Sequence, residues 1–168
     1  MAKPHPFLTN HTQRIQAITH VVYEYGNLMV AGYYSIHGAA PWRTNCDDAF
    51  LLGCRKLDDF FMKDKRSVKG GQELDDILAS DYLPPNTTRR WELPIWTSEW
   101  RDPMNKQLAH IAYSRGKGWD HTIWVPKLVD EFRKAWWDFY GAIIDADYIE
   151  EFDKQRKQRS GRIDLRKW

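Results

Sequence analysis

A short segment in the second half of the chain carries several side chains that can exchange protons or bind anions. In MNKQLAHIAYSR, residues 104–115, Lys106 and His110 are four residues apart, and Tyr113 and Ser114 follow. Side chains at this spacing share one face of a helix. Histidine titrates near neutral pH, which suits general acid–base catalysis. The pattern indicates either a proton-transfer or anion-binding site, or the polar side of an amphipathic helix that faces water.

The element that must position these side chains is a helix over residues 103–115. Asp102 can cap its N-terminus, Pro103 suits the first helical position, and Gly116 and Gly118 stop it. The apolar residues of the segment lie on the face opposite His110, and they are Met104, Leu108, Ile111 and Ala112.

The stretch NKQLAH, residues 105–110, resembles a motif of the HEPN superfamily, especially its abortive-infection-type branches. HEPN proteins are compact helical bundles that often dimerise, and many are RNases of toxin–antitoxin and phage-defence systems. Their signature is an Arg, a variable polar residue and then a His, which act on the RNA backbone without a metal. The resemblance implies that His110 is the acid–base residue, and that Asn105, Lys106 and Arg55 orient or neutralise a phosphate.

The chain departs from the HEPN signature because no Arg stands at or next to Asn105. Arg101 lies too far upstream for the usual spacing, so Lys106 or Arg115 would supply the positive charge. Such a chain is either a metal-independent endoribonuclease or a relative that binds RNA without cutting it. Whether the protein is an enzyme is therefore left open by the sequence.

Arg55 belongs to AFLLGCRKLDDFF, residues 49–61, and has two interpretations. This stretch resembles the earlier helix of HEPN bundles, where an Arg and an acid can point inward, so Arg55 could meet His110 across the bundle. Alternatively, Asp58 and Asp59 lie three and four residues later and could form a surface ion pair worth about 0.3–0.5 kcal/mol.

The end of the chain is dense in basic residues and also has two interpretations. Arg156, Lys157 and Arg159 are candidates to bind nucleic acid, together with Arg115, because cations contact phosphates and Trp168 could stack on a base. Alternatively, residues 154–168 are a solvated, frayed terminus.

Metal and cofactor sites are not expected. Asp75, Asp76 and Asp81 could bind a hard cation such as Mg²⁺, or they cap and solvate a loop. The chain has no C-x-x-C, H-E-x-x-H, phosphate-binding or dinucleotide-binding glycine motif.

Apolar residues at steps of three and four predict an all-α protein. The expected helices cover about residues 10–38, 45–64, 103–115 and 126–152, with Asn10 or Thr9 as the first cap. They indicate an antiparallel four-helix-type bundle with one long, partly irregular connection over residues 65–96. One helical turn is expected at 73–78, and aromatic or apolar residues should pin the connection to the core: Trp91, Ile95, Trp96 and Trp100.

The expected last helix has an apolar arc of roughly 200°, wider than one neighbour requires. It is therefore either central in the bundle or partly covered by a second subunit. This supports an alternative to the RNA hypothesis, a non-enzymatic interaction module. Such a module would form a homodimer, or bind a helical partner, through Trp137, Tyr140 and Ile144.

The length and composition of the chain fit one domain with an N-terminal arm over residues 1–10. The chain has 168 residues, 14% aromatics and a formal net charge of +2, so charge alone does not require a nucleic-acid partner. Cys46 and Cys54 would lie about 12 Å apart on one helix, too far for a disulfide. Unpaired thiols, no signal peptide and no apolar run of about 20 residues indicate a soluble, cytoplasmic protein without a membrane span.

Overall fold

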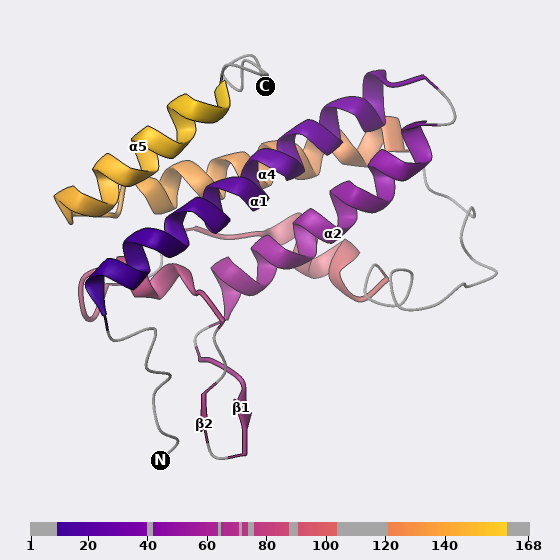
Figure 1. The fold of residues 1–168 in the computed structure, drawn as a ribbon. Helices are drawn as coiled ribbons and strands as arrows, with labels where there is room; N and C mark the ends of the chain where they lie inside the picture. Colours follow the sequence, from indigo (N-terminus) through magenta and orange to yellow (C-terminus); the bar gives the residue numbers. More distant parts are fainter. Residues whose placement is uncertain are drawn as a thin grey trace.

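The structure is a computed structural model that describes residues 10–39, 42–63, 65–70, 72–73, 76–87, 91–103 and 121–160. Its long helices are α1 (His11–His37), α2 (Trp42–Met62), α4 (His121–Tyr140) and α5 (Ala146–Ser160) (Figure 1). After α2 comes a small antiparallel hairpin of two short strands, β1 (Val68–Lys69) and β2 (Gln72–Glu73). Two short helical turns follow it, η2 (Ala79–Tyr82) and η3 (Trp96–Trp100). The prediction of an all-α protein is confirmed.

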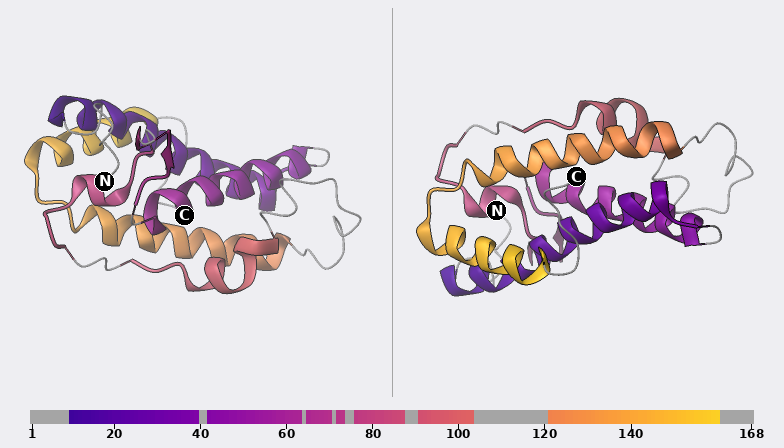
Figure 2. Two further views of the ribbon diagram at one scale, coloured as in Figure 1. Left: turned by 90° about the horizontal axis from the view of Figure 1, so that it is seen from below. Right: turned by 90° about the horizontal axis from the view of Figure 1, so that it is seen from above.

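Helix α1 is the element around which the others are arranged. It packs most extensively against α2 and also contacts α4 and α5. The short connection after α1 makes α1 and α2 run in opposite directions, as do α4 and α5, whereas α1 and α5 run in the same direction (Figures 1 and 2). Among the described helices, none combines the length and the apolar character that crossing a membrane requires.

The first helix begins as predicted. The Asn10 carboxamide oxygen accepts a hydrogen bond of 2.9 Å from the backbone N–H of Thr12, and so caps α1. At the other end, the Gly38 N–H donates to the Tyr34 carbonyl at 2.8 Å. Helix α2 then begins at Trp42, three residues before its expected start at Asn45.

The expected single helix over residues 126–152 is wrong, because the chain forms α4 and α5 there. Helix α4 begins at His121 and contains Pro126, and its last turn closes with a bond from the Gly141 N–H to the Trp137 carbonyl. Asp145 then caps α5, since its Oδ1 accepts from the N–H groups of Asp147 and Tyr148 at 3.0 and 3.3 Å. The break is marked in the sequence by Gly141 at the end of α4 and by the capping residue Asp145 before α5.

Helix α5 also corrects the prediction of a frayed tail from residue 154. The helix continues to Ser160, with Tyr148, Phe152 and Gln155 on its buried face. Residues 161–168, including the predicted stacking residue Trp168, lie outside the described part of the chain.

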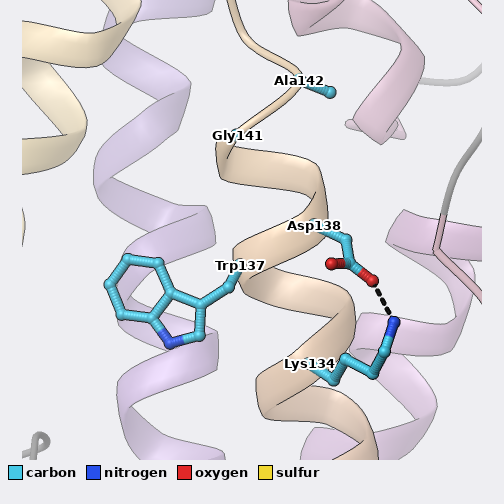
Figure 3. A pocket seen from close by; sticks show the side chains of 5 residues that line it. All are labelled: Lys134, Trp137, Asp138, Gly141 and Ala142. Atoms are coloured by element: carbon cyan, nitrogen blue, oxygen red, sulfur yellow. Dashed lines mark hydrogen bonds and ion pairs between the residues drawn. The ribbon is translucent and has the colours of Figure 1, made fainter.

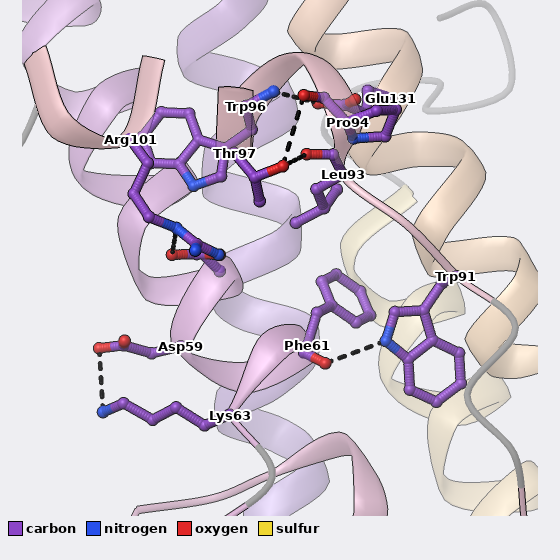
Figure 4. A network of polar contacts seen from close by, with 11 residues as sticks. Asp59, Phe61, Lys63, Trp91, Leu93, Pro94, Trp96, Thr97, Arg101 and Glu131 are labelled. Carbon is purple, nitrogen blue, oxygen red and sulfur yellow. Dashed lines mark hydrogen bonds and ion pairs between the residues drawn. The ribbon is translucent and has the colours of Figure 1, made fainter. Parts of the chain in front are cut away.

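The connection between α2 and α4 is held by aromatic packing, as predicted for its tryptophans. Trp91 and Trp96 are buried, while Ile95 and Trp100 pack against the core. The indole N–H of Trp91 donates to the Phe61 carbonyl at 3.0 Å (Figure 4). The expected helical turn at 73–78 is wrong, because Glu73 belongs to β2 and the turn of helix comes later, at η2.

Candidate functional site

The strongest candidate for a binding site lies where the basic half of α5 meets exposed aromatic rings of α4 and α1. We call it the α5 surface, and it consists of Arg156, Lys157 and Arg159 on α5, Trp137 on α4 and Tyr23 on α1. The rings are 42% exposed at Trp137 and 45% exposed at Tyr23, although most large apolar side chains of the described chain are buried. Helix α5 therefore positions two of the predicted cations, Arg156 and Arg159, over aromatic rings, and carries Lys157 exposed to solvent.

Arg156 is held between a ring and an acid. Its guanidinium carbon lies 5.5 Å from the centroid of the Trp137 ring, and a terminal nitrogen lies 3.1 Å from the Asp153 carboxylate. The same carboxylate accepts a 2.9 Å hydrogen bond from the Tyr140 hydroxyl. Burial raises the pKa of Tyr140, and the bond to Asp153 raises it further, so the hydroxyl remains a donor. Asp153 thus fixes the position of Arg156 over Trp137.

Arg159 contacts an aromatic ring but forms no ion pair with an acid of the described residues. Its guanidinium carbon lies 4.7 Å from the centroid of the Tyr23 ring, which joins the end of α5 to α1. Its Nε is buried and has no hydrogen-bond acceptor in the part of the chain that the structure describes. The charge of Arg159 is therefore not balanced by an ion pair with any acid of the described residues.

A shallow depression adjoins Trp137 at the end of α4. Its volume is about 390 Å³, and Figure 3 shows the residues that line it: Lys134, Trp137, Asp138, Gly141 and Ala142. Lys134 forms an ion pair with Asp138, so these two charges balance each other. Trp137 thus borders both the depression and Arg156 of the α5 surface.

The residues predicted to do catalysis are not in the described part of the structure, apart from Arg55. His110, Asn105 and Lys106 belong to residues 104–120, which lie outside it, and so does Arg115, which was predicted to bind nucleic acid. Their mutual geometry therefore stays a prediction.

Arg55 is exposed on α2, and the two acids considered as its partners bind other cations. Asp58 forms a bidentate ion pair with Arg101, with Nε and Oδ2 2.9 Å apart, and Asp59 lies 3.3 Å from Lys63 (Figure 4). Asp58 points to the buried side of α2, whereas Arg55 lies on its solvent side. Asp58 of α2 thus pairs with Arg101, which follows η3, and not with Arg55.

The acids of the connecting loop serve as ion-pair and capping groups. Asp81 pairs with Arg66 and also accepts the Leu78 N–H at 2.8 Å, while Asp76 lies 3.6 Å from Lys63. These contacts favour the capping interpretation over the Mg²⁺ interpretation for Asp76 and Asp81. Asp75 lies outside the described residues.

A cluster that the sequence did not reveal joins the N-termini of α1 and α5. His11 Nε2 lies 3.1 Å from Asp145 Oδ2 and 3.9 Å from Asp147 Oδ2. His11 and Asp145 are 134 residues apart in sequence, so no local spacing pattern could connect them. The nearest hint is the D-x-D pattern of Asp145 and Asp147 at the start of a helix.

No protein-family model, curated protein or solved structure matches this chain. Any assignment of function rests on the chain's own residues.

Proposed function

We propose that this protein binds RNA at the α5 surface and acts as a HEPN-like helical protein of a defence or toxin–antitoxin system. The observation that carries the proposal is the placement of two guanidinium groups, Arg156 and Arg159, over two exposed rings, Trp137 and Tyr23. His110, Asn105 and Lys106 are proposed to act on the bound RNA backbone, with His110 as the acid–base residue.

The chemistry of the α5 surface suits single-stranded RNA. Arginine side chains contact phosphates, and exposed aromatic rings stack on unpaired bases for about 1–3 kcal/mol per base. Lys157 is exposed on the same helix and adds a third positive charge. The near-neutral total of +2 is compatible with this role, because a local patch determines the attraction.

The test is binding of a fluorescein-labelled single-stranded RNA, measured by fluorescence anisotropy at several salt concentrations. The double variant Arg156→Gln/Arg159→Gln should bind at least about tenfold more weakly and show a smaller salt slope, since each lost phosphate contact reduces the slope by about 0.7. Circular dichroism checks that α5 remains folded in the variant.

The matched control is Lys69→Gln, which removes a positive charge from the exposed hairpin. It should bind RNA like the wild type. An equal loss of RNA affinity in the double variant and in the control, or no loss of affinity in either, would contradict binding at the α5 surface.

A second candidate function is a non-enzymatic interaction module. The observation that favours it is the exposure of Trp137, 42%, and of Ile144, 74%, two of the residues predicted to form such an interface. Sedimentation velocity separates the two functions. A dimer that Trp137→Ser and Ile144→Ser dissociate, in a protein without RNA affinity, would favour the interaction module.

A further inference from the structure

Helices α1 and α5 begin side by side, and their first residues bring an imidazole and two carboxylates together. One ligand atom from each of His11, Asp145 and Asp147 lies within 4.8 Å of the other two. The three side chains are partly or largely solvent-exposed, so an ion can reach them from solution. This cluster is separate from the α5 surface, which lies on the C-terminal half of α5.

The fold orients two of these three side chains. Oδ1 of Asp145 is occupied by the two N–H groups of the first turn of α5, which leaves Oδ2 directed at His11. The His11 ring stacks on the buried Tyr148 ring, with centroids 4.9 Å apart and planes at 26°. Contacts that fix the orientation of a ligand raise its affinity for a metal.

We infer that His11 Nε2, Asp145 Oδ2 and Asp147 Oδ2 form a binding site for a divalent transition-metal ion of the Zn²⁺ class. Imidazole combined with carboxylate selects such ions over Mg²⁺ and Ca²⁺, which prefer oxygen ligands alone. Water would complete the coordination.

The separations of the ligand atoms suit this ion. With Zn–N and Zn–O bonds of roughly 2.1 Å, two ligands of a tetrahedral site lie about 3.4 Å apart. The distances from His11 Nε2 to the two carboxylate oxygens are 3.1 and 3.9 Å, on either side of that value. Small side-chain movements therefore suffice to close the site.

The main effect that opposes cation binding is electrostatic repulsion, because the positive ends of two helices, α1 and α5, point at the cluster. Each N-terminus is equivalent to roughly half a positive charge, so the two carboxylates still leave the site net negative. A bound ion would join segments that are 134 residues apart and would stabilise the folded chain by mass action.

The test uses the full chain after dialysis against EDTA. Zn²⁺ at about 100 times its Kd should raise the Tm by roughly 5–10 °C, whereas Mg²⁺ at the same concentration should not. Isothermal titration calorimetry should give one site, and the affinity should fall at least about tenfold in His11→Ala and in Asp147→Asn. Both variants change exposed side chains, so circular dichroism should show them folded.

The matched control is His20→Ala, which removes another exposed histidine from α1. This variant should bind Zn²⁺ like the wild type. No binding of Zn²⁺ by the wild type, full binding by His11→Ala, or equal stabilisation by Mg²⁺ would overturn the inference.

Discussion

The guanidinium carbon of Arg156 lies 5.5 Å from the centroid of the Trp137 ring, so the basic half of α5 and an exposed ring of α4 share one surface. Arg159 makes the corresponding contact with Tyr23 of α1, at 4.7 Å. Helix α5 thus carries two cations between two rings that unpaired bases could stack on.

Two glycines of α1 should respond in opposite ways to alanine. A Cβ at Gly32 would lie 2.7 Å from Val129 Cγ2, so Gly32→Ala should destabilise the fold by about 1–3 kcal/mol through overpacking. A Cβ at Gly26 would make only an ordinary contact of 3.9 Å with Arg159, so Gly26→Ala should stabilise α1 by about 0.5–1 kcal/mol. Urea denaturation of both variants checks this, and a stabilised Gly32→Ala would contradict the close packing of α1 on α4.

Two neighbouring aspartates on α2, Asp58 and Asp59, should contribute different amounts to the free energy of unfolding. Asp58 is buried and holds Arg101 in a bidentate pair, so Asp58→Asn should cost about 1–3 kcal/mol. Asp59→Asn is the matched control, because its pair with Lys63 is exposed and should contribute less than about 1 kcal/mol. Chemical denaturation measures both changes, and equal effects would show that the Asp58–Arg101 pair does not hold η3 against α2.

Glu131 should make the folded state less stable as pH rises, the reverse of what a carboxylate in an ion pair does. Its buried carboxylate accepts the N–H groups of Ile95 and Trp96 at 2.6 and 2.9 Å. Burial raises its pKa above the ordinary value of 4.5, and these two hydrogen bonds only partly oppose the shift. The folded state thus keeps a proton that the unfolded state has lost, and the stability from Glu131 falls as pH rises from 4.5 to the raised pKa.

The measurement is the free energy of unfolding of the wild type and of Glu131→Gln between about pH 4 and pH 7. Since glutamine does not ionise, the stability of the wild type relative to the variant should decrease across the lower part of this range and then stay level. A relative stability that increases with pH would contradict the raised pKa.

The long helices could be predicted from periodicity, because the residues of their buried faces recur every three or four positions. The break at Gly141 was missed, since the apolar pattern that reaches Tyr140 before it continues in Ile143, Ile144 and Tyr148 after it. There the local cap at Asp145 overrides the apolar pattern.

Functional clusters were harder to predict than helices. Arg156, Lys157 and Arg159 were candidates from charge alone, but their contacts with Trp137 and Tyr23 depend on how three helices pack. The partner of Asp58 was also missed, because Arg101 is 43 residues away and the nearby Arg55 offered a local alternative.

The HEPN-like part of the proposal predicts RNA cleavage that needs no metal. The wild type should cut a single-stranded RNA in EDTA, and His110→Ala should reduce the rate by at least about 100-fold, the usual contribution of a general acid–base group. His20→Ala is the matched control and should cleave normally. Cleavage that survives His110→Ala would remove His110 from the catalytic site, while RNA binding without any cleavage would identify a non-cutting relative.

The most direct test of RNA binding at the α5 surface is ultraviolet crosslinking to a uridine-rich single-stranded RNA, followed by mass spectrometry of the crosslinked peptides. Binding there predicts crosslinks at Trp137 and Tyr23, which disappear in Arg156→Gln/Arg159→Gln but persist in Lys69→Gln. Crosslinks confined to other peptides, or none at an RNA concentration that saturates binding, would contradict it.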